Sequence, residues 1–232
     1  LRLSPPNNDR LVRGDTFVKQ VGGAELNVAV GVALLGLRTG VISKLPSHDM
    51  GSFMKGKIRS YGVSDDFFMY DDSPSARVGI YYYENGAYPR KPKVIYDRAN
   101  SSFYSLKIDE IPEKAYTASR CFHTSGITLA LSPKVRETTI EMIKRFKAAG
   151  TLVSFDVNVR GNLWTGEEAK ECIEQILPYV DIFFCSEDTA RLTFKKTGTA
   201  REMMKSFTEE YPISIVASTQ RIVHSPKSHT FG

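Results

Sequence analysis

The sequence is poor in the residues that mark several classes of protein. Its three cysteines, Cys121, Cys172 and Cys185, are an odd number at wide spacing. That pattern favours buried thiols in a reducing compartment over a disulfide framework or a zinc site. The four histidines show no metal-ligand spacing, so we expect no structural metal. No charged-then-apolar leader opens the chain, and together these features predict a cytoplasmic protein.

Long apolar runs and blocks of one charge are also missing. The longest apolar stretch, Val28 to Leu37, is interrupted by glycines and is shorter than the roughly 20 residues of a membrane-spanning helix. The net charge is +5 at pH 7, but the basic residues are scattered singly among acids. A mixed, solvated surface is the plainest interpretation, and an anionic small-molecule partner is the main alternative. No basic motif interleaved with aromatics predicts nucleic-acid binding.

The composition is that of an ordinary globular protein, with 41% hydrophobic and 25% charged residues. Helical and strand-like patterns alternate along the chain, which predicts a layered α/β fold. Ser132-Pro133 opens the clearest helix, and Gly150 lies just past its end. Thr165 and Glu168 form a capping box before another helix. The stretch 26–37 is apolar nearly all round, so we expect a buried helix there.

Two stretches, near 11–22 and 67–98, break this alternation and predict β-structure. Residues 80–83 read Ile-Tyr-Tyr-Tyr and are strongly strand-prone, and a turn is expected at Asn85-Gly86. We interpret these stretches as a small β-sheet lid over the mouth of the main sheet. Such lids exclude water during group-transfer chemistry.

A glycine pair precedes the first predicted helix. Gly22 and Gly23 would let backbone approach a ligand closely, and the positive end of the helix points to the same place. Asn27 is a polar group in an otherwise apolar helix. It either binds a ligand hydroxyl or is a satisfied buried amide behind a simple helix cap.

Four motifs in order suggest a family. Residues 22–29 read Gly-Gly-Ala-Glu-Leu-Asn-Val-Ala, residues 94–98 Val-Ile-Tyr-Asp-Arg, residues 123–128 His-Thr-Ser-Gly-Ile-Thr and residues 156–160 Asp-Val-Asn-Val-Arg before Leu163-Trp164. Over essentially its whole length the chain resembles the ribokinase-like carbohydrate kinases of the PfkB family. It is most similar to the branch that acts on 2-keto-3-deoxygluconate.

The resemblance implies a fold and a reaction. The fold would be a mainly parallel sheet flanked by helices, with a small β-sheet lid and a substrate bound between the two. The reaction would be phosphorylation of a sugar-acid hydroxyl with ATP and Mg²⁺, and a homodimer would form through the lids. Matched residue by residue, the implied substrate-binding residues are Gly23, Asn27, Tyr81, Tyr96, Arg98 and Arg160.

The two arginines also make chemical sense by themselves. A planar guanidinium forms paired hydrogen bonds with a carboxylate, which a lysine cannot copy. The alternatives are a surface strand arginine for Arg98 and a helix-end or ion-pair arginine for Arg160. Alternation along a strand places Tyr81 and Tyr83 on one face, although all the tyrosines here could be packing residues.

A second group of polar residues would lie at strand ends on the nucleotide side. Asp156 and Asn158 follow a predicted parallel strand, the usual position of ligand groups in an open α/β sheet. Ser186-Glu187-Asp188-Thr189 matches a family motif whose acids act on Mg²⁺ through water, except that Thr189 replaces the last acid. The alternative is an acid pair that simply stabilises the helix dipole.

One family motif is missing from these residues. No Gly-Ala-Gly-Asp turn occurs, and the resemblance places this anion hole and catalytic aspartate beyond Gly232. We therefore expect one incomplete ribokinase-like domain over residues 1–232, truncated at both ends and inactive alone. The alternative functions are a fructokinase or ribokinase relative and a non-catalytic sugar-acid binding protein. No Gly-x-Gly-x-x-Gly follows a strand, which argues against a dinucleotide oxidoreductase.

Overall fold

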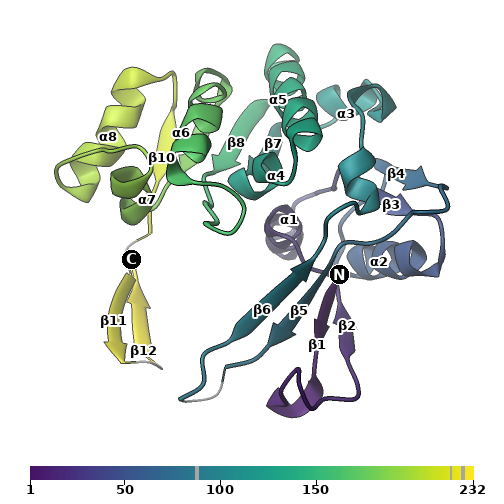
Figure 1. Ribbon diagram of the computed structural model, residues 1–232. Coiled ribbons are helices and arrows are strands. Elements are labelled where there is room, and N and C mark those ends of the chain that lie inside the picture. The colour runs from purple at the N-terminus through teal and green to yellow at the C-terminus, as the bar shows by residue number, and fades with distance from the viewer. Residues whose placement is uncertain (87–88, 220, 226–227) are drawn as a thin grey trace. The chain divides into compact units, whose positions relative to one another are not determined.

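The computed structural model describes residues 1–86, 89–219, 221–225 and 228–232 (Figure 1). They form two compact units, Leu1–Ile111 and Pro112–Gly232. Each unit combines strands with helices, as the alternating patterns predicted. The expectation of a single incomplete domain over residues 1–232 stays a prediction.

The first unit contains two small sheets and two helices. In chain order its elements are β1 (Arg2–Ser4), η1 (Pro6–Asn8), β2 (Val18–Gln20), α1 (Ala24–Leu34), β3 (Ser43–Pro46), α2 (Asp49–Ser60), β4 (Phe68–Asp71), β5 (Ile80–Glu84), β6 (Lys93–Asp97), η2 (Ser102–Ser105) and η3 (Ile108–Glu110).

Four of these strands form a sheet in the order β2-β1-β5-β6, which we call the N-terminal sheet. Strand β1 is antiparallel to β2 and parallel to β5, and β5 is antiparallel to β6. Strands β2, β5 and β6 fall in the ranges where lid strands are expected. Strand β4 falls there too, but it pairs in parallel with β3, because α2 connects the two as a β-α-β crossover. Residues 68–71, expected among the lid strands, therefore do not belong to the N-terminal sheet.

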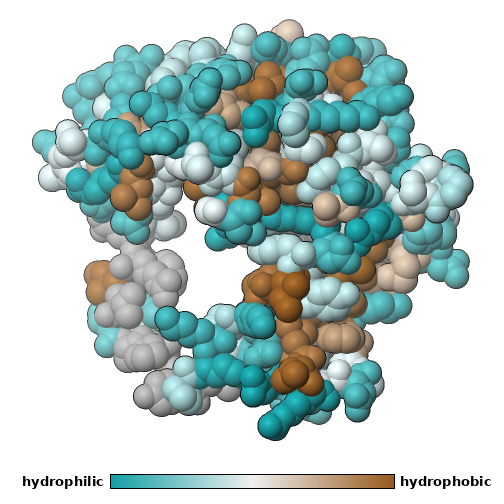
Figure 2. All heavy atoms as spheres, viewed as in Figure 1, coloured by the Kyte–Doolittle hydropathy of each residue, from teal (hydrophilic) through white to brown (hydrophobic). Residues whose placement is uncertain are grey.

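The register gives the N-terminal sheet two distinct faces. Tyr81 pairs with Arg2 on one side and with Tyr96 on the other. Since side chains alternate, Arg2, Ser4, Tyr81, Tyr83 and Tyr96 share one face, which we call the tyrosine face. Figure 2 shows hydrophobic residues gathered over the strands of this sheet and hydrophilic residues around its hairpin end.

The core of the first unit lies between α1, α2 and the β3-β4 pair. Its buried members are apolar residues from all of these elements and one loop: Leu26, Ala29, Leu45, Ile58, Val63 and Phe68. The expectation that the first helix is buried all round is wrong in this structure. Leu34 and Leu35, at its C-terminal end, are 79% and 81% exposed, because α1 packs against this core with one side only.

The second unit is built on a four-stranded parallel sheet in the order β10-β9-β8-β7. In chain order its elements are α3 (Lys114–Thr117), β7 (Cys121–Ser125), α4 (Gly126–Ala130), α5 (Pro133–Ala148), β8 (Leu152–Asp156), α6 (Gly166–Glu174), η4 (Leu177–Tyr179), β9 (Ile182–Phe184), α7 (Glu187–Leu192), α8 (Ala200–Glu210), β10 (Ile215–Ala217), β11 (Arg221–Ser225) and β12 (Ser228–Phe231). Strands β11 and β12 form a separate antiparallel hairpin.

Local capping signals confirm the predicted helix boundaries in this unit. The Ser132 hydroxyl accepts a hydrogen bond from the Val135 amide at 3.2 Å, and Gly150 has a φ of +81° after the last turn of α5. At α6, the Thr165 hydroxyl accepts from the Glu168 amide at 3.2 Å, while the Glu168 carboxylate accepts from the Thr165 amide at 2.7 Å.

The two faces of the parallel sheet differ in burial. Phe155 and Phe183 are fully buried on one face, whereas Leu152 and Phe184 on the other are 49% and 41% exposed. The strands are parallel, so their carboxyl ends meet at one edge, where the candidate nucleotide-side residues follow β8 and β9. Within the described ranges, no helix is long and apolar enough to cross a membrane.

The two glycines of α2 give a test of its packing. A Cβ at Gly51 would lie 1.9 Å from the Pro46 carbonyl oxygen, whereas a Cβ at Gly56 would meet nothing within 4 Å. We expect Gly51→Ala to lower the free energy of unfolding by about 2 kcal/mol or more, because backbone must move. Gly56→Ala should raise it by about 0.5–1 kcal/mol through helix propensity. Urea unfolding of both variants measures the difference, and equal effects would contradict the packing of α2 on β3.

Candidate functional site

The glycine pair lies at the exposed start of α1. Gly23 is the N-cap residue, with an extended φ of 162° and no side-chain cap. The Asn27 amide donates the first helical hydrogen bond to the Gly23 carbonyl at 2.9 Å. Gly23 and Asn27 are both exposed, so Asn27 is not the buried amide that the alternative interpretation required. Gly23 supplies no side-chain acceptor to the first turn of α1, and backbone N–H groups at a helix start are suited to an oxygen ligand.

Tyr81 extends from the N-terminal sheet to this helix start. A Cβ at Gly22 would lie only 2.3 Å from the Tyr81 hydroxyl oxygen, so the contact depends on a residue without a side chain. The ring centroids of Tyr81 and Tyr96 lie 6.1 Å apart across β5 and β6. Burial raises the pKa of Tyr81 above its ordinary value. The hydroxyl therefore stays protonated and can donate a hydrogen bond at neutral pH.

Arg98 lies over the ring of Tyr96, with its guanidinium carbon 4.3 Å from the ring centroid. Its neighbour Asp97 is paired with Arg77 at 2.8 Å, and among the described residues no carboxylate forms an ion pair with Arg98. The first unit thus brings together Gly23, Tyr81, Tyr96 and Arg98, four of the six residues that the sequence predicts on the substrate side, with Asn27 one turn into the helix.

Arg160, the sixth of these residues, lies in the second unit and is exposed. Its carbonyl accepts a hydrogen bond from the Leu163 amide at 2.8 Å. Arg98 and Arg160 thus belong to different units of the chain. A carboxylate shared by Arg98 and Arg160 therefore stays a prediction.

Asp156, the last residue of β8, and Asn158 form a tight turn at the end of this strand. The Asp156 carboxylate accepts a hydrogen bond from the Asn158 amide at 3.2 Å, and Asn158 has a φ of +35°. The intervening Val157 amide donates to the Phe184 carbonyl of β9 at 3.0 Å. The turn is therefore anchored to the neighbouring strand, and its polar groups lie at the carboxyl edge of the sheet.

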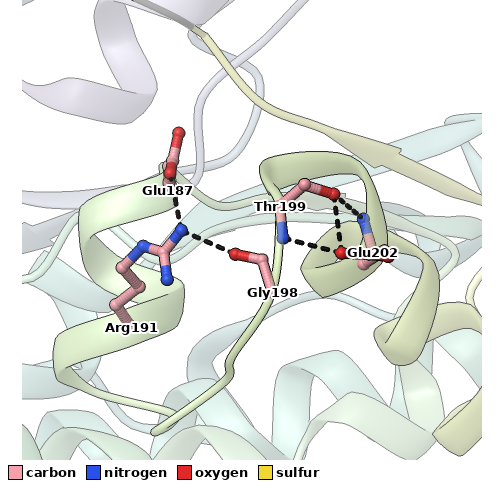
Figure 3. Close-up of polar contacts among 5 residues, drawn as sticks. All are labelled: Glu187, Arg191, Gly198, Thr199 and Glu202. Carbon is pink, nitrogen blue, oxygen red and sulfur yellow. Dashed lines mark hydrogen bonds and ion pairs between the residues drawn. The ribbon is translucent and has the colours of Figure 1, made fainter.

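Glu187 and Asp188, the two acids at the start of α7, differ in their contacts. Ser186 caps this helix by accepting a hydrogen bond from the Thr189 amide at 3.2 Å. Figure 3 shows Glu187 paired with Arg191, which also donates to the Gly198 carbonyl; these distances are 2.9 and 2.6 Å. Glu187 is thus held within its own helix. The same view contains the capping box of Thr199 and Glu202 that starts α8.

Asp188 is exposed and lines a pocket of about 450 Å³. The other lining residues come from α6, α7 and the segments next to them: Val159, Gly166, Glu167, Thr189, Leu192, Thr193 and Lys195. Asp188 of the predicted motif therefore borders an open pocket next to α6 and α7. Both acids also lie in the first turn of α7, where they favour the helix dipole.

The metal chemistry of this edge follows from its donors. Within the described residues, no group of three or more His, Cys, Asp or Glu side chains is placed to hold a metal ion. Burial raises the pKa of the neighbouring Cys185 thiol to about 12, so this residue offers no thiolate. Mg²⁺ in phosphoryl-transfer sites commonly uses one or two carboxylates together with water and phosphate oxygens. Asp188 fits such a sparse donor set, whereas Glu187 is already paired with Arg191.

Sequence reasoning missed β1 and therefore Arg2. A strand of three residues carries too little pattern to be predicted. The alternation of Leu1, Arg2, Leu3 and Ser4 is the only signal that could have revealed it. In the structure this strand completes the tyrosine face beside Tyr81.

Comparison with known proteins shows the family of this chain. The family model for pfkB family carbohydrate kinases matches residues 2–220. The chain belongs to the PfkB family of carbohydrate kinases. Among PfkB relatives, it is 34% identical over 220 residues to a 2-dehydro-3-deoxygalactonokinase of Haloferax volcanii, covering 95% of this chain and 68% of that protein. It is 32% identical over 172 residues to a 2-dehydro-3-deoxygluconokinase of Bacillus subtilis, covering 73% of this chain and 52% of that protein.

The solved structures agree on the fold. The crystal structure of a 2-dehydro-3-deoxygluconokinase from Thermotoga maritima matches with a TM-score of 0.90 and 33% identity, covering 98% of this chain and 70% of that one. The ribokinase-like PfkB fold expected from the motifs, a parallel sheet flanked by helices, is thereby confirmed. The chain spans about half to two thirds of the length of the curated relatives described here.

The contact between Gly22 and Tyr81 gives a second prediction. We expect Gly22→Ala to displace the Tyr81 hydroxyl, because the new methyl group occupies its position and the ring is the part that can swing away. The measurement is the ¹³Cζ chemical shift of Tyr81 in labelled protein. The control is Gly23→Ala, whose Cβ would have Leu26 Cβ at 3.7 Å as its nearest neighbour and should leave the signal in place. An unchanged Tyr81 signal in Gly22→Ala would contradict the contact.

Proposed function

We propose that the full-length protein carrying this chain transfers a phosphoryl group from ATP to a hydroxyl of a 2-keto-3-deoxy sugar acid. The main support is the position of Arg98. Its guanidinium has no carboxylate partner among the described residues and lies beside Tyr96 on the sheet whose Tyr81 extends to the Gly22-Gly23 turn. The activities of the relatives, which are kinases of deoxy sugar acids, support the same substrate class.

Each kind of polar group on the substrate has a proposed hydrogen-bond donor. The carboxylate would bind Arg98, with Arg160 as the second arginine, because a guanidinium offers two parallel N–H donors to two carboxylate oxygens. The keto group and hydroxyls would bind the Tyr81 and Tyr96 hydroxyls, the backbone at Gly23 and the Asn27 amide. A substrate held at several points loses the freedom to present the wrong hydroxyl.

The nucleotide would bind on the carboxyl edge of the parallel sheet. When bound, ATP supplies the phosphoryl group, and Mg²⁺ offsets the charge that develops on its oxygens. The residues we assign to this side are Asp156, Asn158, Ser186 and Asp188, with Glu187 a weaker candidate because it is paired with Arg191. We assign no proton-abstracting residue among residues 1–232, because no aspartate in them has the family's Gly-Ala-Gly-Asp context.

A homodimer through the N-terminal sheets is part of the proposal. Strands β2 and β6 are the outer strands of that sheet, and an unpaired strand edge invites pairing with another copy. The lid role that we give to this sheet is a proposal as well. Both would be tested by the oligomeric state of the protein and by solvent exclusion on ligand binding.

The reaction is tested by assaying the full-length protein with ATP, Mg²⁺ and four acceptors: 2-keto-3-deoxygluconate, its galactonate epimer, ribose and fructose. We expect transfer to one or both acids to exceed transfer to the neutral sugars. Equal or greater transfer to ribose or fructose would favour the fructokinase or ribokinase alternative. Binding of an acid without any transfer would favour a non-catalytic binding protein.

A variant of Arg98 tests the substrate side. Arg98→Met removes a charged hydrogen-bond donor of about 1.5–3 kcal/mol, so we expect the KM for the sugar acid to rise by about tenfold to a hundredfold. The value of kcat should change little if this contact holds substrate and transition state equally. Arg98→Lys should recover part of the loss, since it restores the charge without the planar fork. An unchanged KM in Arg98→Met would remove this residue from the site.

A further inference from the structure

A second arginine of the first unit lies on the tyrosine face without a polar partner. The Nε atom of Arg2 is buried and has no hydrogen-bond acceptor, and the same is true of the Ser4 hydroxyl, two residues further along β1. The guanidinium carbon of Arg2 lies over the ring of Tyr83, 5.8 Å from the ring centroid. No carboxylate of the described ranges forms an ion pair with Arg2.

This arrangement is costly unless an acceptor arrives. A buried donor without an acceptor loses its hydration and gains nothing in exchange, and the cost is larger for a charged group. A ring contact returns only part of that energy. Two other arginines close to the N-terminal sheet are compensated: Arg90 pairs with Glu84 at 3.1 Å, and Arg77 pairs with Asp97. Arg2 therefore needs a specific explanation.

The register places Arg2 beside the residues already assigned to substrate. Arg2 is the cross-strand neighbour of Tyr81, which is the neighbour of Tyr96, and Arg98 lies over the Tyr96 ring. The Arg2 and Tyr96 backbones are two strand spacings apart, or about 10 Å. The side chains of Arg2 and Arg98 can therefore reach one small ligand from its two ends. Burial raises the pKa of the Tyr81 hydroxyl, and the positive charge of Arg2 acts in the opposite direction and lowers it.

We propose that Arg2 is a further substrate-binding residue, which donates from its guanidinium to the carboxylate end of a sugar acid, with the Ser4 hydroxyl as a second donor. The inference rests on the proposed function and deepens it. Two cations on one face, Arg2 and Arg98, would make the first unit selective for an acid by itself. A neutral sugar would leave the Arg2 donor without an acceptor, so its binding would be weaker than that of the acid.

The test compares two ligands of nearly the same shape, one with a charged carboxylate and one with a neutral carboxamide. Binding of 2-keto-3-deoxygluconate and of its neutral C1 carboxamide is measured by titration calorimetry in the full-length protein and in Arg2→Met. We expect Arg2→Met to weaken binding of the acid by about tenfold or more, which is the loss of one charged hydrogen bond. Binding of the carboxamide should change by less than about threefold, since it makes no ion pair with Arg2.

Two further variants serve as controls. Lys93→Gln removes one positive charge from the same sheet. Lys93 is opposite Glu84 in the β5-β6 register, so its side chain is on the face away from Tyr81 and Tyr83. This variant should leave both affinities unchanged. Arg2→Lys keeps the charge and most of the stem, so it should bind the acid better than Arg2→Met. If Arg2→Met fails to fold, as judged by circular dichroism, Arg2→Lys decides: a loss of about threefold or more for the acid alone is expected, because lysine has no Nε–H donor at that position.

The outcomes separate this inference from the proposed function. Equal acid affinities in wild type and Arg2→Met, or equal losses for acid and carboxamide, would overturn the role of Arg2 and leave the kinase proposal standing. A wild-type protein that binds ribose or fructose but not the acid would overturn both.

Discussion

The contact between Tyr81 and Gly22 is the constraint on which the candidate substrate site depends. A Cβ at position 22 would lie 2.3 Å from the Tyr81 hydroxyl oxygen, so only glycine allows the N-terminal sheet to reach the start of α1 in this way. That contact places the protonated Tyr81 hydroxyl beside the start of α1, and the β5-β6 register places Tyr96 and Arg98 next to Tyr81. Hydrogen-bond donors from the N-terminal sheet and from the start of α1 thereby lie next to one another.

Some cations of the first unit are paired with a carboxylate and others are not. Lys44 is buried and paired with Glu110 at 2.5 Å, which satisfies it where it stands. Arg2 and Arg98 have ring contacts but no carboxylate among the described residues. Two cations without a carboxylate partner on one face of a sheet are suited to an anionic ligand, which is the basis of the proposed sugar-acid site.

Local patterns predicted much of the second unit and less of the first. Caps at Ser132 and Thr165 set helix boundaries because their hydrogen bonds join residues three apart, which a sequence shows directly. The partner of β4 could not be predicted in that way, since it follows from the β-α-β crossover through α2. The exposure of Leu34 and Leu35 likewise depends on which side of α1 meets the core.

By itself, the sequence determined the α/β class, the order of the motifs and the residue types of the candidate site, because these follow from periodicity, capping and chemistry along the chain. Only the tertiary structure decided that Glu187 is held by Arg191 while Asp188 borders a pocket, and that Arg2 joins the tyrosine face. The physical reason is that pairing and burial are set by neighbours distant in sequence. A strand of three residues acquires its meaning only from the strands beside it.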